Sequence, residues 1–168
     1  MPDASTPTHL SGQDLETWAA LATVLEWLPS ALDAQLQRDA GLTHFEYGVL
    51  YALAHAPDHT LRMSVLAGYA NSTLSRLSRA ATRLERKDWL RRTADPADGR
   101  YTLAILTDLG LEKVEQATPG HAALVRRLVL EPLTQAQTRQ LREISKRITR
   151  SIRDEDGWQP SSHAVSPG

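Results

Sequence analysis

Residues 62–106 read RMSVLAGYANSTLSRLSRAATRLERKDWLRRTADPADGRYTLAIL, and their pattern defines the fold class. A short apolar segment at about residues 63–69 predicts one helix. A longer segment, residues 73–87, repeats apolar residues at a spacing of three or four and predicts a second helix, with Thr73 as its N-cap. The two segments are separated by only a few polar residues, so they predict a helix-turn-helix.

Two short extended segments follow, at residues 89–93 and 101–106, with Leu103 and Ile105 on one face of the second. The residues between them, Asp95 to Gly99, include Pro, Asp and Gly, which favour turns. We therefore expect a hairpin. A helix-turn-helix followed by a two-stranded hairpin is the winged-helix arrangement.

On the N-terminal side, residues 14–37 place Leu and Trp on one stripe of a long helix that Gly41 ends. Pro29 removes a backbone hydrogen bond inside this helix, so a kink or a break is predicted there. Thr43 caps the next helix, and Glu46 completes a capping-box pattern.

On the C-terminal side, Thr107 and Thr134 are the predicted N-caps of two further helices. The last helix carries a narrow stripe typical of helix pairing, made by Leu141, Ile144, Ile148 and Ile152. The stripes on the first and last helices exceed what a small domain needs for its own core, which favours a shared dimer interface.

The expected fold class is therefore mainly α with a small β-hairpin wing: a winged helix-turn-helix flanked by N- and C-terminal dimerisation helices. The chain divides into a flexible N-terminal tail (1–12), an N-terminal dimerisation helix (13–40), a DNA-binding lobe (41–106), C-terminal dimerisation helices (107–153) and a flexible C-terminal tail (154–168).

The 168 residues are 41% hydrophobic and 23% charged, an ordinary globular composition, and include no cysteine. Disulfides, thiolate metal sites and cysteine nucleophiles are therefore excluded. No uncharged run approaches the roughly 20 residues of a membrane span, and no secretory signal opens the chain. We expect a cytoplasmic protein without a cofactor, and the absence of phosphate-loop, Gly-x-Ser-x-Gly and His-Glu-x-x-His motifs argues against an enzyme.

The net charge of −1 is the sum of two opposed parts. Residues 62–100 hold nine Lys and Arg against four Asp and Glu, a net charge of +5, while the other 129 residues sum to −6. A basic patch confined to a helix-turn-helix and a wing indicates double-stranded DNA as a partner, because phosphate neutralisation supplies most of the non-specific affinity.

Several stretches match one family. They are Ser64 to Ala67, Arg76 to Arg79, Arg83 to Lys87, the wing signature Asp95-Pro96-Ala97-Asp98-Gly99-Arg100, Thr107 to Gly110, and Leu130 to Thr134. Over about residues 15–152 the chain resembles the multiple-antibiotic-resistance regulator (MarR) family of dimeric winged-helix transcription factors. Asp88 stands where the family usually has Gly, and Arg62 where it often has a Thr or Ser cap. The resemblance implies a homodimer, here interpreted as a repressor, that binds a pseudo-palindromic operator.

A recognition helix enters the major groove with its N-terminal turns, so its outward residues are expected to reach DNA. Arg76 and Arg79 are the predicted readers of guanine; Thr73 and Ser75 are expected to contact phosphate or cap the helix, with Ser78 close behind. The inward positions are expected to be Leu74, Leu77, Ala81 and Leu84.

The wing supplies further expected contacts. Arg100 resembles the family's wing arginine, which reaches into the minor groove, and Asp98 is expected to orient it through a charge-assisted hydrogen bond. Arg62 is a candidate phosphate contact. Since Arg91 and Arg92 alternate along a strand, at most one of them is expected to face DNA.

Family members commonly sense small aromatic or phenolic anions. The candidate lining of such a cleft is Trp18, Trp27, Tyr47 and Tyr51, with core or interface packing as the alternative. The irregular spacing of His44, His55, His59 and His121 gives little support to a metal-responsive regulator, and no metal ligand is assigned. A winged-helix module that binds protein partners and not DNA is the remaining alternative.

Overall fold

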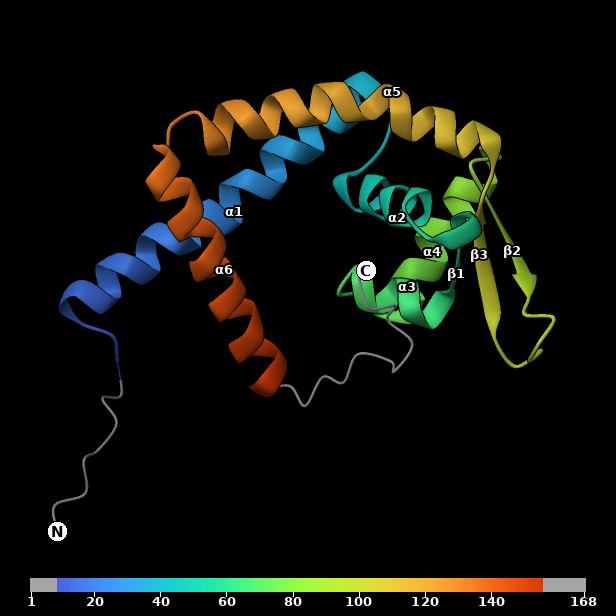
Figure 1. Ribbon diagram of the computed structural model, residues 1–168, viewed down its shortest axis with the longest axis horizontal. Coiled ribbons are helices and arrows are strands. Elements are labelled where there is room, and N and C mark those ends of the chain that lie inside the picture. Colours follow the sequence, from blue (N-terminus) through green and yellow to red (C-terminus); the bar gives the residue numbers. More distant parts are fainter. Residues whose placement is uncertain (1–8, 156–168) are drawn as a thin grey trace, which may run out of the picture.

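The protein's computed structural model describes residues 9–155 (Figure 1). Its elements, in chain order, are α1 (Gly12–Ala40), α2 (His44–Ala54), the short 3₁₀ turn η1 (Pro57–His59), β1 (Thr60–Arg62), α3 (Met63–Tyr69), α4 (Leu74–Glu85), β2 (Leu90–Ala94), β3 (Thr102–Leu106), α5 (Asp108–Val125), the π-helical turn η2 (Arg126–Leu130) and α6 (Gln135–Glu155). The predicted fold class, mainly α with a winged helix-turn-helix, is confirmed.

The winged-helix lobe comprises α2, α3, α4 and the small sheet, and it holds most of the core (Figure 1). Its largest fully buried side chains include Leu42, Val49, Leu50, Leu53, Leu66, Leu77, Leu84 and Leu90. These residues come from every helix of the lobe and from β2, so the lobe closes a hydrophobic core largely from its own residues.

The sheet has a third strand that the sequence pattern did not predict. β1 pairs antiparallel with β3, with Leu61 opposite Ala104, and the strand order is β1-β3-β2. A three-residue strand is too short to display a period, so only its pairing partner defines it. The strand matters for the site because it places Arg62 beside the wing.

Hydroxyl caps fix the starts of the helices. The Thr43 hydroxyl accepts a hydrogen bond from the Glu46 amide at 3.0 Å, and the Glu46 carboxylate accepts one from the Thr43 amide at 3.0 Å, which confirms the capping box. Thr73 and Thr107 cap α4 and α5 in the same way, through the amides of Arg76 and Gly110.

Helix α1 is continuous through Pro29, so the predicted break is absent. Pro29 leaves the Leu25 carbonyl without its helical donor. Leu25 itself is 56% exposed, so solvent can supply that donor. The helix ends as predicted at Gly41, whose φ of 63° is left-handed.

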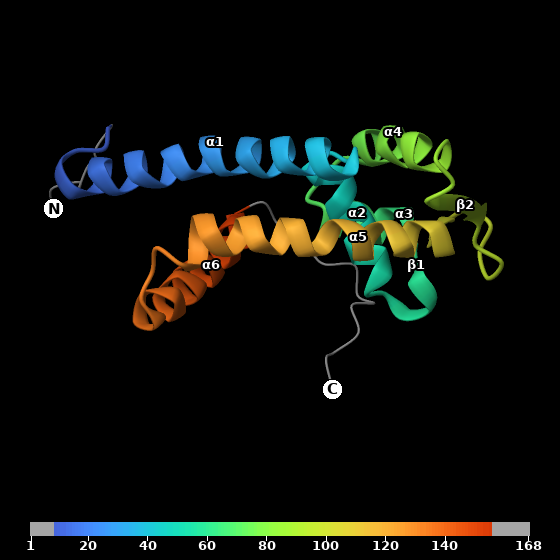
Figure 2. The same ribbon diagram turned by 90° about the horizontal axis from the view of Figure 1, so that it is seen from above.

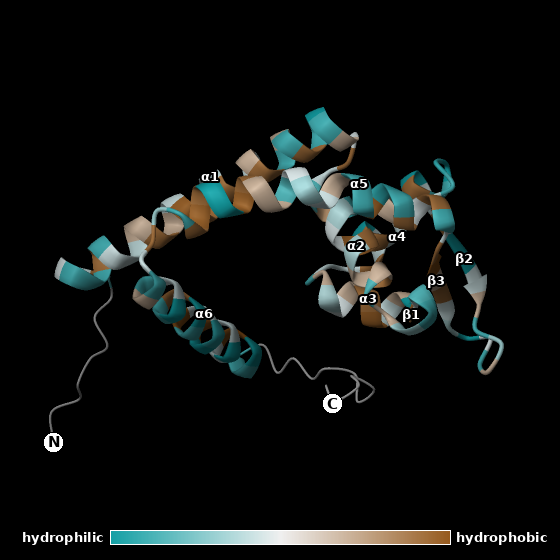
Figure 3. Ribbon diagram, turned by 45° about the horizontal axis from the view of Figure 1, so that its top comes forward, coloured by the Kyte–Doolittle hydropathy of each residue, from teal (hydrophilic) through white to brown (hydrophobic). Residues whose placement is uncertain are grey.

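Helices α1, α5 and α6 extend away from the lobe (Figure 2). α1 runs alongside α5, and only its C-terminal part contributes buried residues, namely Leu32, Gln35, Leu36 and Ala40. Helix α6, described in full, has no buried residue. Figure 3 shows hydrophobic positions recurring along α1 outside the lobe, and the apolar stripes predicted for α1 and α6 therefore lie largely exposed in the single chain.

The predicted tails, 1–12 and 154–168, lie mostly outside the described residues, although α6 includes Asp154 and Glu155. Within residues 9–155, none of the helices has the length and apolarity needed to span a bilayer.

Candidate nucleic-acid interface

Helix α4 separates an inward apolar face from an outward polar face. Leu77, Ala81 and Leu84 are buried as predicted, together with Ala80. Ser75, Arg76 and Arg79 are exposed on the other side. The Thr73 hydroxyl accepts from the Arg76 amide at 3.2 Å, which fixes where this exposed face begins.

The expectation that Leu74 packs inward is wrong, because 53% of this residue is exposed. Leu74 lies three residues before Leu77 and therefore on the same face of the helix, but it is the first residue of α4. A helical side chain covers surface toward the N-terminus of its own position, so the side chain of the first residue extends past the end of the helix.

The two predicted base readers have different surroundings. The Arg76 guanidinium lies over the Phe45 ring at 4.2 Å, a cation–π contact with α2. Arg79 makes no hydrogen bond or ion pair with any residue in the described range. Arg79 is therefore free to meet a ligand without losing an internal contact.

Arg92 joins the wing to α4. Its guanidinium donates to the hydroxyls of Ser78 at 3.0 Å and Thr82 at 2.9 Å, and it pairs with the Glu85 carboxylate. The hydrogen bond from Arg92 lowers the pKa of Glu85 and, reciprocally, raises that of Arg92. Arg92 thus has internal partners, whereas its neighbour Arg91 is exposed. The Ser78 hydroxyl accepts from Arg92 and so takes part in the contact between α4 and the wing.

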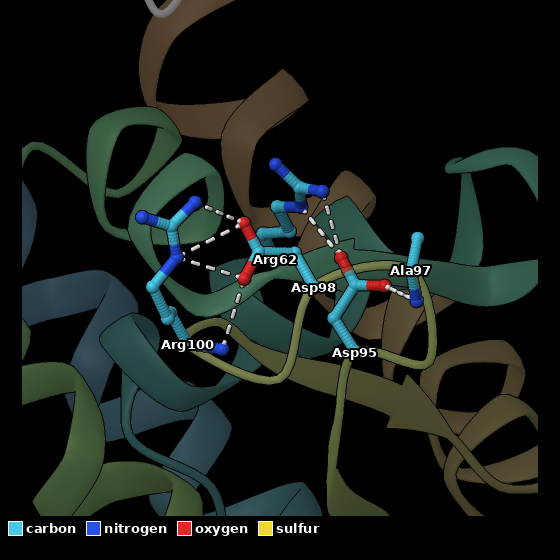
Figure 4. A network of polar contacts seen from close by, with 5 residues as sticks. All are labelled: Arg62, Asp95, Ala97, Asp98 and Arg100. Carbon is cyan, nitrogen blue, oxygen red and sulfur yellow. Dashed lines mark hydrogen bonds and ion pairs between the residues drawn. The ribbon is translucent and has the colours of Figure 1, made fainter.

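The wing loop is held by two carboxylates (Figure 4). Asp95 accepts from the Ala97 amide at 2.9 Å and from Arg62 Nε at 2.8 Å, and these bonds lower its pKa although burial acts to raise it. The Arg62 guanidinium also lies 4.3 Å from the centre of the Tyr101 ring. Arg62 therefore fastens the wing to β1, a role that the sequence alone did not indicate.

The predicted hydrogen bonds between Asp98 and Arg100 are present. Arg100 Nη2 donates to Asp98 Oδ2 at 2.7 Å and Arg100 Nε to Asp98 Oδ1 at 2.9 Å, and the bonds from Arg100 lower the pKa of Asp98 (Figure 4). The Arg100 side chain remains 84% exposed, so it projects from the wing while Asp98 orients its guanidinium group.

An ion pair between α2 and α4 was missed by sequence reasoning. Arg83 Nε donates to Glu46 Oε1 at 2.7 Å. Burial acts to raise the pKa of Glu46, but the hydrogen bonds from Thr43 and the Arg83 pair outweigh it and the pKa is lowered. The capping-box pattern identified Glu46, but no local pattern could identify a partner 37 residues away.

The basic surface is thus smaller than the residue count implies. Arg62, Arg83, Arg92 and Arg100 all have carboxylate partners. Arg79, Arg86 and Arg91 have no ion-pair partner among the described residues, and all three are exposed. The unneutralised positive charge therefore lies on α4, on the turn after it and on one face of β2.

A cleft of about 950 Å³ lies between α1 and the lobe. It is lined by Pro29, Ser30, Asp33, Thr43, His44, Phe45, Gly48, Ala52, Leu66, Tyr69, Ala70, Arg76, Arg79 and Arg83. None of the four predicted aromatic residues belongs to this lining. Three arginines of α4 do, which connects the cleft to the outward face of the helix.

The four aromatic residues occupy two other places. Trp27 is 75% exposed and borders an apolar groove between α1 and α6, while Trp18 is 50% exposed further along α1. Tyr47 is buried, with its hydroxyl 3.0 Å from that of Thr118, and its ring lies 5.7 Å from the ring of Tyr51. Within the single chain the four residues do not line one cleft, because Tyr47 points toward α5 and the tryptophans lie on α1 beyond the lobe.

The histidines do not form a metal site within residues 9–155, where no three His, Asp or Glu side chains gather closely enough to hold an ion. His121 lies against Tyr47 and His44, with ring centres 4.7 and 5.7 Å away. Burial and the neighbouring His44 lower the pKa of His121, which favours a neutral packing role.

An exposed, partly unpaired basic helix beside an oriented wing arginine defines a class: winged helix-turn-helix transcriptional regulators. Comparisons with known proteins refine this class. Residues 40–100 match the model of the MarR family. Sco3205, a MarR family transcriptional regulator from Streptomyces coelicolor solved in complex with DNA, is 41% identical, with 95% of this chain and 97% of that chain covered and a TM-score of 0.84.

Two further transcriptional regulators are similar to this chain. AbsC, a MarR family transcriptional regulator from Streptomyces coelicolor, is 32% identical over 87% of this chain and 98% of that one, with a TM-score of 0.82. An uncharacterised HTH-type transcriptional regulator, YdcH of Bacillus subtilis (strain 168), is 33% identical over 46% of this chain and 54% of its own length, so the match spans about half of that relative. The chain belongs to the MarR family. Its class is that of transcriptional regulators and not of enzymes.

Proposed function

We propose that the protein is a homodimeric repressor that binds a pseudo-palindromic operator and is released from it by a small aromatic or phenolic anion. The observation that carries the proposal is the outward face of α4, where Arg76 and Arg79 stand exposed above a fully buried apolar face. A cationic face on a helix that projects from a rigid lobe suits the major groove.

Each site residue has a proposed role in DNA binding. Arg76 and Arg79 read base edges, Thr73 and Ser75 contact phosphate at the start of α4, and Arg100 enters the minor groove with Asp98 behind it. Arg62 and Ser78 support DNA binding indirectly: Arg62 donates to Asp95 and Ser78 accepts from Arg92, and both hydrogen bonds hold the wing in place.

The DNA-binding test starts from a random-duplex selection, followed by gel shifts on the selected site. We expect Arg76→Ala combined with Arg79→Ala to lose about 1–3 kcal/mol of discrimination per good contact, and Arg100→Ala to weaken all sequences more evenly. Arg127→Ala, an exposed arginine of η2, is the control and is expected to bind like the wild type. If all the variants bind alike, the site assignment is wrong; if the wild type binds no duplex, the alternative of a protein-interaction module takes its place.

The proposed dimer rests on the exposed apolar stripes. Val24, Trp27 and Leu28 of α1 face Leu141 and Ile144 of α6 across a groove of about 690 Å³ whose walls are mostly apolar. A contiguous apolar surface of this kind on a soluble regulator indicates a protein partner, and a second copy of the chain supplies the two-fold symmetry that a pseudo-palindrome requires.

The proposed effector site is the cleft between α1 and the lobe. Phe45 and Tyr69 offer aromatic surface, and Arg76, Arg79 and Arg83 offer cations for a carboxylate or phenolate. Since Arg76 and Arg79 also belong to the proposed DNA-reading face, an anion that holds them competes with DNA.

A thermal-shift panel of aromatic acids and phenols, followed by DNA-release assays, tests the effector. We expect at least one compound to raise the Tm and to release DNA, and Phe45→Ala to weaken both effects. If no compound stabilises the protein or releases DNA, the effector proposal fails and DNA binding stands on its own.

A further inference from the structure

Leu74 is an exposed leucine in the middle of a polar surface. It is 53% exposed, whereas the next apolar positions of α4, Leu77 and Ala81, are fully buried. A leucine exposed to this degree at the start of the helix contributes little to the core, so its apolar side chain is available to a partner.

The surroundings of Leu74 identify the place where that partner lies. A shallow hollow of about 550 Å³ separates the first turns of α4 from the base of the wing. It is lined by Met63, Leu74, Ser75, Ser78, Arg79, Arg92 and Thr102. The hollow thus lies between α4 and the wing, the two elements that the proposed function places against DNA.

Apart from Leu74 and the buried Met63, the residues that line the hollow are polar or charged. The hydroxyl and guanidinium groups there suit phosphates and the polar edges of bases. In the major groove the apolar group that a base edge presents is the 5-methyl of thymine, and apolar side chains recognise it by contact. The N-terminal residues of a recognition helix are the ones that reach base edges.

We propose that Leu74 is a specificity-determining residue that contacts the 5-methyl group of a thymine in each half-site of the operator. The inference rests on the proposed function, because it requires α4 to enter the major groove. It adds a thymine preference, set by an apolar contact, to the guanine preference expected from the arginines.

The test replaces thymines of the selected site by deoxyuridine, which lacks only the 5-methyl group. For the wild type, replacing one particular thymine in a single half-site is expected to weaken binding about fourfold, the worth of burying one methyl group, and replacing it in both half-sites about fifteenfold. Leu74→Ala is expected to bind the thymine duplex more weakly by a similar factor and to be insensitive to deoxyuridine at that position. Leu109→Ala, at the start of α5 with 54% exposure, is the matched control and is expected to keep the wild-type response.

Two results overturn the inference while leaving DNA binding intact: a wild type that tolerates deoxyuridine at every position, or a Leu74→Ala variant that retains the wild-type sensitivity at the same thymine. A wild type that binds no duplex at all overturns the proposed function itself, and the inference with it. A selection repeated with Leu74→Ala gives an independent readout, with the thymine preference expected to relax at that single position.

Discussion

The winged-helix lobe buries its apolar residues, whereas the helical arms formed by α1 and α6 leave many of theirs exposed. In the lobe, leucines such as Leu50, Leu53 and Leu77 have no exposed surface. On α6 the stripe residues Ile144 and Ile148 are 54% and 41% exposed. The lobe therefore completes a core within one chain, whereas the arms leave apolar stripes exposed, the surface on which the proposed dimer rests.

The difference also extends to charge. In the lobe, basic side chains gather next to carboxylates that orient them, as in Arg62 with Asp95 and Arg100 with Asp98. Most of the charged residues of helix α1 are acidic, whereas α6 carries more basic than acidic residues. Carboxylates in the lobe thus orient the arginines of the candidate site, whereas the two arms differ from each other in the sign of their net charge.

The largest expected effect comes from placing charge on the α6 stripe. Ile144→Glu combined with Ile148→Glu is expected to weaken the dimer by at least about a thousandfold, because the apolar gain of two isoleucines, about 2 kcal/mol each, is lost and carboxylates are left unpaired. Sedimentation velocity measures the dissociation, and circular dichroism is expected to show an intact lobe. Lys146→Glu with Arg150→Glu places new carboxylates on the opposite face and is expected to remain dimeric.

A second comparison removes the same atoms from each region. Leu53→Ala is expected to cost about 2–5 kcal/mol in the free energy of unfolding, because it leaves a cavity in a closed core. Leu25→Ala, at a residue that is 56% exposed on α1, is expected to change stability by less than about 0.5 kcal/mol when measured in the monomeric Ile144→Glu/Ile148→Glu background. Urea denaturation measures both, and equal costs would contradict the division into a closed lobe and open arms.

Gly110 tests how tightly α5 is seated on the lobe. A Cβ at this position would lie 2.0 Å from the Trp89 carbonyl oxygen and 2.7 Å from Leu106 Cδ1, and the first of these is backbone. We expect Gly110→Ala to destabilise the lobe by about 3 kcal/mol. Gly48→Ala, where a Cβ meets nothing within 4 Å, is the control and is expected to be neutral or stabilising by up to about 1 kcal/mol.

The smallest effect concerns pH. Because the pKa of Glu46 is lowered in the folded protein, its contribution is fully present above the unfolded value of about 4.5 and is lost as the pH falls through the folded value. Glu46→Gln keeps an amide oxygen for the cap but removes the ion pair with Arg83, and it is expected to cost about 1 kcal/mol at pH 7. Urea denaturation from pH 7 to pH 3 is expected to show a shallower acid-side loss of stability for this variant; an unchanged slope would assign the loss to other carboxylates.

Much of the fold could be predicted from the sequence because its signals are local. The caps at Thr43, Thr73 and Thr107 and the turn residues between Asp95 and Gly99 act within a few residues, and all appear where expected. Asp88, which stands where the family usually has Gly, adopts a left-handed conformation with φ of 56°, a conformation that glycine favours.

The failures have a common physical origin. The predicted break at Pro29 is absent from α1, because the cost of a missing hydrogen bond depends on whether solvent reaches the carbonyl left behind. Leu74 follows the apolar spacing of α4, but burial at a helix end depends on what the neighbouring elements cover. The four predicted aromatic residues lie apart in the single chain for a similar reason, because α1 extends beyond the lobe and carries its tryptophans away from Tyr47.

The sequence by itself determined which segments become helices and strands, where they are capped and where positive charge concentrates, because periodicity, capping and net charge are properties of neighbours along the chain. Only the tertiary structure decided which arginines stay free. Arg83 meets Glu46 and Arg62 meets Asp95 across 37 and 33 residues, while Arg79 meets no acidic partner among the described residues. Pairing between distant charges depends on the distances that folding creates, and those distances leave Arg79 without a carboxylate partner on the exposed face of α4. The packing of the neighbouring elements likewise leaves Leu74 exposed at the start of that helix.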